Sequence, residues 1–222
     1  ERVFRMHDAQ PAYASIVGAG ANACVLHYRD NSAKSRDGEL VLIDAGAEYR
    51  GYAADITRTF PVNGRFSKEQ RALHDLVCAA QATALAQSRP GVAYEAGHDA
   101  AVATLTEGLL SLGLLKGRLE TAIERGDYKR FYRHKTGHWL GLDVHDVGEY
   151  RIDGESRLLE PGMVFTLEPG LYIPSDDASV PAKWRGIGIR IEDDVLVTAD
   201  GHRVLTTALE RSADEVEGLM AG

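Results

Sequence analysis

Four carboxylates occupy positions where an unpaired charge would be costly, because each lies at the end of an apolar segment or inside one. Asp44 ends a run of four aliphatic residues, and Asp55 is flanked by small and β-branched residues. Glu168 ends a second apolar run before a Pro-Gly stop, and Glu192 lies in the alternating segment 188–194. Since a buried carboxylate needs a compensating partner, these acids are candidates for metal ligands or proton carriers.

Each acid also has a purely structural interpretation. Asp44 precedes Ala-Gly and could cap a turn, which is common chemistry for aspartate. Asp55 could form an ion pair with Arg58 or with a lysine. Glu192 and Arg190 share one face of their strand-like segment and could form an ion pair on its solvent side. Spacing alone does not decide between these interpretations and a functional site.

Histidines cluster in one stretch of the chain: His134, His138 and His145 fall within twelve positions, out of eight histidines in all. Glycines interrupt the stretch, so it is not a continuous helix, and no glutamate follows His134 as a zinc-protease helix requires. Histidine is the commonest metal ligand and the usual proton carrier near neutral pH. The clustering favours a functional site over a set of structural histidines.

Together, four carboxylates and one imidazole form an oxygen-rich donor set. Such a set suits Mn²⁺, and Co²⁺ or Zn²⁺ less exclusively. No thiolate is included, so a structural zinc site is not expected. Four carboxylates around one ion would carry excess negative charge, whereas two ions about 3.5 Å apart share bridging carboxylates and can clamp a hydroxide with the oxygen it attacks. The set comprises Asp44, Asp55, His138, Glu168 and Glu192.

The elements that must position these residues follow in the order strands, helices, strands, helix, which indicates an α+β fold with helices packed on an antiparallel sheet. A capping-box sequence, Ser67 to Gln70, begins the first long helix, and Arg89-Pro90-Gly91 ends it. Further helices are predicted over residues 93–112, 119–125 and 212–220. Strands are predicted over residues 13–18, 24–28, 40–44, 52–60, 131–134, 163–168, 187–197 and 203–205.

Composition narrows the class of protein. The formal net charge of −8 argues against a nucleic-acid-binding protein. No apolar run approaches the roughly 20 residues of a membrane span, and no signal peptide opens the chain. The two cysteines, Cys24 and Cys78, lie in apolar runs and are expected to be free thiols of a reducing compartment, so a cytoplasmic location is expected.

Four segments, 44–60, 137–148, 167–172 and 188–194, closely resemble the metallopeptidase family of methionine aminopeptidase, prolidase and aminopeptidase P, and the resemblance is closest to aminopeptidase P. It extends over nearly the whole chain, and all five metal positions occur in the family's order. The resemblance implies the pita-bread fold, with residues 1–222 forming one catalytic domain.

The family resemblance also implies a ligand assignment. Asp55, His138, Glu168 and Glu192 would hold one metal ion, and Asp44, Asp55 and Glu192 would hold the other. The donor chemistry above favours manganese for both ions. Glu168 would also help to move the proton of a hydroxide that bridges the two ions and attacks the peptide. The implied reaction is hydrolysis of the N-terminal Xaa-Pro bond of peptides that have proline in second position.

Other residues match positions on the substrate side of the family's site. His27, His134 and His145 are expected to be catalytic: His145 would contact the peptide around the scissile bond, and His27 would help to stabilise the tetrahedral intermediate. Arg190 matches an arginine that orients the acids without binding the metal. A prolidase acting on Xaa-Pro dipeptides, and a pita-bread binding module without catalysis, are the alternatives.

Two departures from the family pattern stand out. Lys135 follows His134 where many relatives have glycine. The long helix and the separate N-terminal domain that precede the catalytic domain in aminopeptidase P are expected to be absent, so we expect the chain to be a fragment of a longer protein that forms a homo-oligomer.

Overall fold

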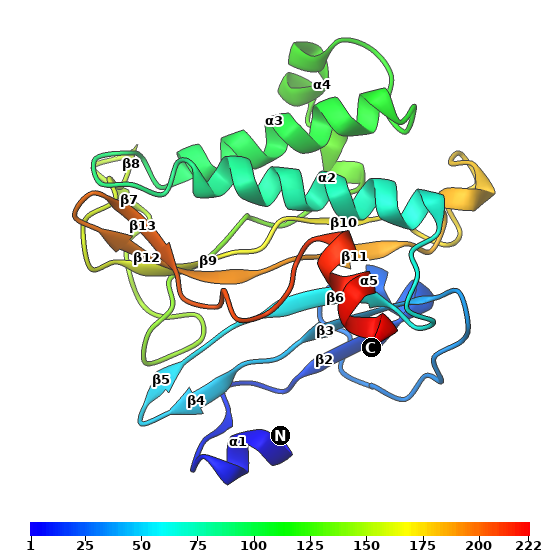
Figure 1. Ribbon diagram of the computed structural model, residues 1–222. Coiled ribbons are helices and arrows are strands. Elements are labelled where there is room, and N and C mark those ends of the chain that lie inside the picture. The colour runs from blue at the N-terminus through cyan, green and yellow to red at the C-terminus, as the bar shows by residue number, and fades with distance from the viewer.

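The computed structural model describes residues 1–222 as layers of short antiparallel strands covered by long helices (Figure 1). The N-terminal part contains α1 (Arg2–Met6), β1 (Gln10–Pro11), β2 (Ile16–Ala19), the 3-10 helix η1 (Gly20–Cys24), β3 (Leu40–Asp44), β4 (Ala47–Tyr49), β5 (Tyr52–Ala53) and β6 (Thr57–Pro61). Helices α2 (Lys68–Leu85), α3 (Glu95–Ser111) and α4 (Leu119–Arg125) and the 3-10 helix η2 (Asp127–Arg130) follow. The C-terminal part contains β7 (Arg151–Ile152), β8 (Glu155–Ser156), β9 (Val164–Leu167), β10 (Gly170–Tyr172), η3 (Ala182–Trp184), β11 (Gly188–Arg190), β12 (Asp193–Thr198), β13 (Gly201–Val204) and α5 (Ala213–Ala221).

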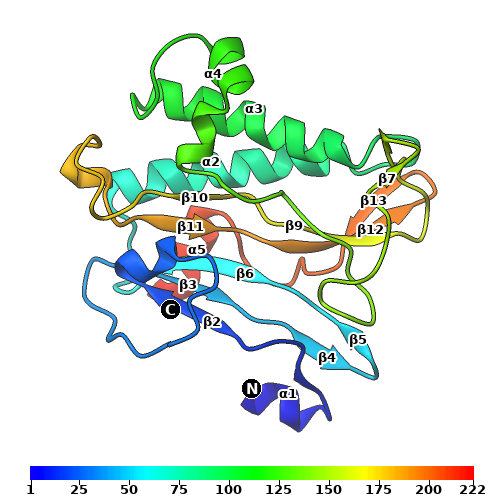
Figure 2. The ribbon, with the colours of Figure 1, turned by 180° about the vertical axis from the view of Figure 1, so that it is seen from behind.

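All strand pairs are antiparallel, in sheets ordered β2-β3-β6, β1-β4-β5, β10-β11, β13-β12-β9 and β7-β8. In both ribbon views, α2 and α3 lie on one side of the β9–β12 layer and β3 and β6 lie on the other (Figures 1 and 2). Hydrogen bonds join β6 to β11 where the two layers meet: the Thr59 hydroxyl donates to the Arg190 carbonyl at 3.0 Å, and the Glu192 N–H donates to the Thr57 carbonyl at 3.0 Å. The predicted α+β class is confirmed.

Helix α2 begins at the predicted place because the capping box satisfies its free N–H groups. The Ser67 hydroxyl accepts from the Gln70 N–H, and the Gln70 side chain accepts from the Ser67 N–H. Leu73 and Val77 on α2, and Leu105 and Leu109 on α3, are fully buried in the main core cluster. No helix of the structure is both long and apolar enough to span a membrane.

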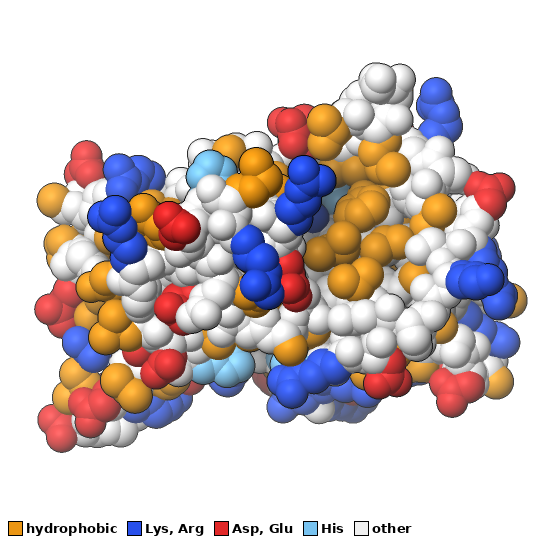
Figure 3. Space-filling model, turned by 90° about the horizontal axis from the view of Figure 1, so that it is seen from below, with side chains coloured by type: hydrophobic (Ala, Val, Ile, Leu, Met, Phe, Trp, Pro, Cys, Tyr) orange, Lys and Arg blue, Asp and Glu red, His pale blue; other side chains and the backbone are white.

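The face seen from below, on the side of α1, has a different surface. Hydrophobic side chains gather there in a hollow flanked by lysine and arginine side chains (Figure 3). Helix α1 has five residues and lies before β1 and β2 in the chain.

Two strand predictions were wrong. Residues 24–28 form the end of η1 and a turn; the alternation of Cys24, Leu26 and Tyr28 imitates a strand because these three side chains pack on a small core cluster. Residues 131–134 lack a strand ladder, although the Phe131 carbonyl accepts from the Tyr172 N–H at 2.9 Å. Consecutive burial of Phe131 and Tyr132 gave an apolar run without a strand.

Two other predicted strands exist but are divided where the acids occur. The predicted strand 52–60 is divided into β5 and β6 around Asp55, and the predicted strand 187–197 is divided into β11 and β12 around Glu192. At the first break the Asp55 N–H donates to the Asp194 carboxylate, 3.3 Å from each oxygen, instead of to a strand carbonyl. The acids therefore lie at irregular points of the ladder.

His74 makes stability depend on pH. This α2 residue is 1% exposed, and burial lowers its pKa from 6.5 to about 4. The unfolded chain therefore takes up a proton more readily between pH 6.5 and pH 4, so stability is lost as pH falls through that window. We expect His74→Gln to reduce the loss of unfolding free energy between neutral and acidic pH by up to about 3 kcal/mol. Urea unfolding at pH 7 and pH 4.5 measures this loss, with the exposed His202→Gln as control. The same loss in His74→Gln as in the unchanged protein would contradict the prediction.

Candidate metal centre

Asp44 and Asp55 are brought together by a close approach of two backbone segments. Asp44 is the last residue of β3, opposite Ile16 on β2 and Thr57 on β6. Two residues later, a Cβ atom on Gly46 would overlap the carbonyl oxygen of Ala54. Only glycine allows this approach, which places Asp55 beside the end of β3.

Tyr13 joins the same two acids. Its hydroxyl oxygen lies 2.5 Å from Asp44 Oδ1 and 2.5 Å from Asp55 Oδ1. Burial and the two carboxylates raise the pKa of Tyr13 far above its usual value of 10, so it stays a hydroxyl donor. Sequence reasoning missed this residue because a tyrosine at the start of an apolar strand has nothing to distinguish it.

His138 and Glu168 are placed by pairing between residues 136–138 and β9. The Thr166 N–H donates to the His138 carbonyl at 2.9 Å, and the Glu168 N–H donates to the Thr136 carbonyl at 2.7 Å. A side chain at Gly137 would overlap the Thr166 carbonyl, so glycine is needed between them. The pairing places His138 Nε2 3.8 Å from Glu168 Oε1 and 3.4 Å from Asp55 Oδ2.

Glu192 completes the group from the opposite layer. It is 2% exposed, and its Oε2 accepts from the Thr57 hydroxyl at 2.6 Å. Ligand atoms of Asp55, His138 and Glu192 all lie within 4.8 Å of one another, as a shared metal ion requires. Thr57, which sequence reasoning did not single out, thus holds a carboxylate at the centre of the site.

Arg190 is the arginine that forms an ion pair with a carboxylate of this group, that of Asp44. Its Nη2 donates to Asp44 Oδ2 at 2.6 Å, its Nε to the Thr57 hydroxyl at 3.1 Å and its Nη1 to the Tyr172 hydroxyl at 3.1 Å. Arg190 is 3% exposed, so the interpretation that Arg190 and Glu192 form an ion pair on a solvent face is wrong.

The structural interpretation of Asp55 is wrong as well. Arg58 forms its ion pair with Asp193, at 2.7 Å, and not with Asp55. Asp194 is a further acid that sequence reasoning did not assign: it accepts from the Asp55 N–H, and burial raises its pKa to about 7. Its place two residues after Glu192, on the same strand face, was the available signal.

The three histidines expected on the substrate side lie in the same cavity of about 260 Å³. The His145 ring packs edge-on against that of His138, with 4.3 Å between centroids. His134 Nδ1 lies 3.7 Å from Glu168 Oε2, while its Nε2 lies 2.9 Å from the Tyr172 hydroxyl. His27 is exposed and also lines the cavity. All nine predicted site residues therefore line one cavity, and their individual roles stay predictions.

The electrostatics of the cavity suit divalent cations. Burial, which outweighs the attraction of Arg190, raises the pKa of Asp44 and raises that of Glu168 to about 7. Burial and neighbouring carboxylates raise the pKa of Glu192 well above its usual range. The pKa of His138 is raised because the Asp55 and Glu168 carboxylates outweigh the effect of its burial. Four carboxylates facing one arginine fit hard or borderline divalent ions, whose charge they would balance.

This fold and donor set are those of a metallopeptidase, and the chain belongs to metallopeptidase family M24, whose model matches residues 1–199. The chain is 51% identical over 218 residues to Xaa-Pro aminopeptidases of Haemophilus influenzae and Escherichia coli. That match covers 98% of this chain and 50% and 49% of the two relatives, so the chain spans about half the length of the curated relatives it matches.

Solved structures agree with these relatives. Aminopeptidase PepP of Pseudomonas aeruginosa superposes with a TM-score of 0.97 at 56% identity, over 98% of this chain and 50% of that one. Aminopeptidase P of Escherichia coli with the inhibitor Pro-Leu superposes with a TM-score of 0.96 at 50% identity, over 99% of this chain and 50% of that one. The pita-bread fold is therefore confirmed.

Gly137 offers a test of how the site is held. We expect Gly137→Ala to lower the free energy of unfolding by about 2 kcal/mol or more, because the added Cβ forces the His138 segment away from β9. Gly201→Ala is the matched control, since a Cβ there meets nothing within 4 Å. Denaturant unfolding of both variants measures the difference, and equal stability of the two would show that the close pairing is not required.

Proposed function

We propose that this chain is the catalytic part of a dinuclear metal-dependent aminopeptidase that hydrolyses the N-terminal Xaa-Pro bond of peptides. The observation that carries the proposal is the convergence of Asp55, His138 and Glu192 ligand atoms within 4.8 Å, in a cavity that Asp44 and Glu168 also line. The names of the relatives support the substrate class.

The proposed ligands divide into two overlapping sets. Asp55, His138, Glu168 and Glu192 would hold one ion, and Asp44, Asp55 and Glu192 would hold the other. Manganese fits this oxygen-rich donor set best, with cobalt or zinc as substitutes. Divalent ions held by these residues would make a water molecule a stronger nucleophile near neutral pH and would polarise the substrate carbonyl.

The chain's own residues supply binding, orientation and proton transfer. Glu168 lies 3.7 Å from His134 and 3.8 Å from His138, and in this proposal it would accept the nucleophile's proton. His145 and His27 are both exposed at the cavity; His145 would contact the peptide, and His27 would donate to the charge that develops on the carbonyl oxygen. Arg190 fixes Asp44, and Thr57 fixes Glu192, so that neither acid has to reorganise during the reaction.

Metal content tests the two overlapping ligand sets. We expect Asp55→Ala and Glu192→Ala each to reduce bound metal from two equivalents to none, because each residue is proposed to bridge both ions. Asp44→Ala should retain one equivalent. Glu160→Ala, which removes an exposed acid outside the cavity, should retain both. Elemental analysis after dialysis measures the stoichiometry; two full equivalents in either bridging variant would refute the assignment.

Substrate length separates an aminopeptidase from a prolidase. We expect the full-length protein to cleave a tripeptide Xaa-Pro-Xaa and not to be confined to the dipeptide Xaa-Pro. Chromatographic detection of the released first residue measures this. Cleavage of dipeptides alone would identify a prolidase, and no cleavage of either by metal-loaded protein would identify a binding module.

We also propose a cytoplasmic location for the protein. Both cysteines are free thiols, as is usual for proteins of a reducing compartment.

A further inference from the structure

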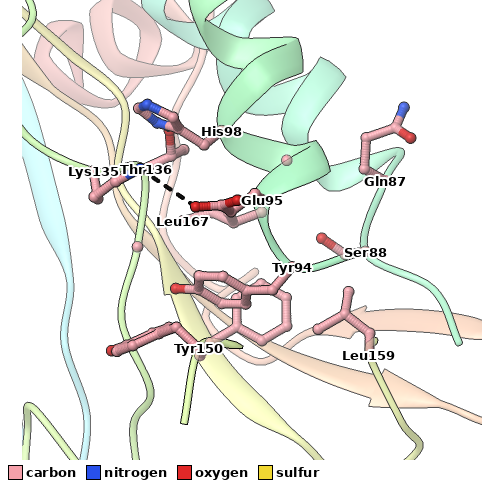
Figure 4. A pocket seen from close by; sticks show the side chains of 13 residues that line it. Gln87, Ser88, Tyr94, Glu95, His98, Lys135, Thr136, Tyr150, Leu159 and Leu167 are labelled. Carbon is pink, nitrogen blue, oxygen red and sulfur yellow. Dashed lines mark hydrogen bonds and ion pairs between the residues drawn. The ribbon is translucent and has the colours of Figure 1, made fainter. Parts of the chain in front are cut away.

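A second cavity, of about 300 Å³, lies behind the segment that carries His138. Residues from the end of α2, the start of α3 and strand β9 enclose it (Figure 4). It shares Lys135 and Gly137 with the lining of the metal cavity. Its size is at the lower end of the range for small-molecule sites, about 300 Å³ and upward, so it can take a small molecule but not a folded segment.

The floor of this cavity is aromatic and aliphatic. Tyr94 packs against Tyr150 and Phe165, with ring centroids 5.1 and 5.6 Å apart, and Leu159 and Leu167 complete the apolar lining. Figure 4 shows the Tyr94 and Tyr150 rings side by side at the base of the cavity. Such a floor favours a flat or branched apolar group.

The rim, in contrast, carries one charge of each sign. Lys135 Nζ and Glu95 Oε1 are 3.8 Å apart, which is too long for a hydrogen bond (Figure 4). The Lys135 side chain is 69% exposed and makes no hydrogen bond through its ammonium, while the other oxygen of Glu95 accepts from Arg151 Nη2 at 2.6 Å. The rim therefore holds a long ion pair above an apolar cavity, and neither the ammonium nor this carboxylate oxygen makes a hydrogen bond that a ligand would have to replace.

From this arrangement we propose that the cavity binds a free apolar α-amino acid. The side chain would enter between Tyr94 and Leu167, the α-carboxylate would pair with Lys135, and the α-ammonium would pair with Glu95. A zwitterion can pair with both rim charges at once, whereas a simple anion or cation would pair with one rim charge and face the other, which has its own sign. The proposal does not depend on peptide hydrolysis at the metal centre.

Calorimetry on the metal-loaded full-length protein tests the charge match with three probes: L-phenylalanine, 3-phenylpropionate, which lacks the ammonium, and 2-phenylethylamine, which lacks the carboxylate. Lys135→Met should weaken phenylalanine and 3-phenylpropionate about fivefold and spare the amine. Glu95→Gln should weaken phenylalanine and the amine by a similar factor and spare 3-phenylpropionate. Variants that change all three affinities equally, or none, would overturn the proposal.

Filling the cavity tests its location. Gly97, on α3, lines the cavity, and an added Cβ would make only ordinary contacts of 3.6 to 4.0 Å with Ala84 and Leu167. Gly97→Leu should therefore weaken phenylalanine at least about tenfold, and Gly97→Ala should leave it within about twofold. Binding that Gly97→Leu leaves intact would place phenylalanine at the metals and overturn the proposal. If Gly97→Leu lowers stability, Lys135→Met still tests the proposal, because this exposed side chain can be replaced without disturbing the core.

Discussion

Mutual repulsion among buried carboxylates is the constraint on which this structure depends. Asp44, Asp55 and Glu192 are each under a tenth exposed, and Glu168 faces the same cavity. Removing such groups from water is costly unless opposite charge or hydrogen bonds compensate. The protein supplies part of that compensation through the Arg190 guanidinium, the Tyr13 and Thr57 hydroxyls and the imidazole of His138. Two bound divalent ions would supply the rest. The acids that are costly to bury without a metal are therefore the same acids that would bind it.

The fold brings the acids together where two layers of strands meet. Asp44 and Asp55 come from the β3–β6 layer, Glu168 and Glu192 come from the ends of β9 and β11, and the bonds between β6 and β11 fix the two groups against each other. Glycines at 46 and 137 permit the closest approaches. Each acid lies where a strand ends or is interrupted, and its side chain lines the cavity. The helices α2 and α3 contribute none of the proposed ligands; they bury the other face of the β9–β12 layer.

Much of this could be predicted from the sequence, and the reasons are physical. Carboxylates at the ends of apolar strands are costly, so Asp44 and Glu168 were visible as candidates, and the capping box located α2 to the residue. Tyr13 and Thr57 were not predictable, since their importance comes only from what lies across the sheet. The strand expected at residues 24–28 was wrong because alternating burial against a core cluster imitates strand periodicity. The solvent-face interpretation of Arg190 and Glu192 was also wrong. Alternation of charged residues shows that they share one face of a strand, but it does not show whether that face meets water.

Anomalous diffraction from crystals of the manganese-loaded protein, collected at the manganese absorption edge, tests most directly whether paired cations sit among these acids. We expect two peaks about 3.5 Å apart, with Asp55 and Glu192 contacting both. A single peak, or peaks elsewhere with the acids engaged only by Arg190 and Tyr13, would contradict the account.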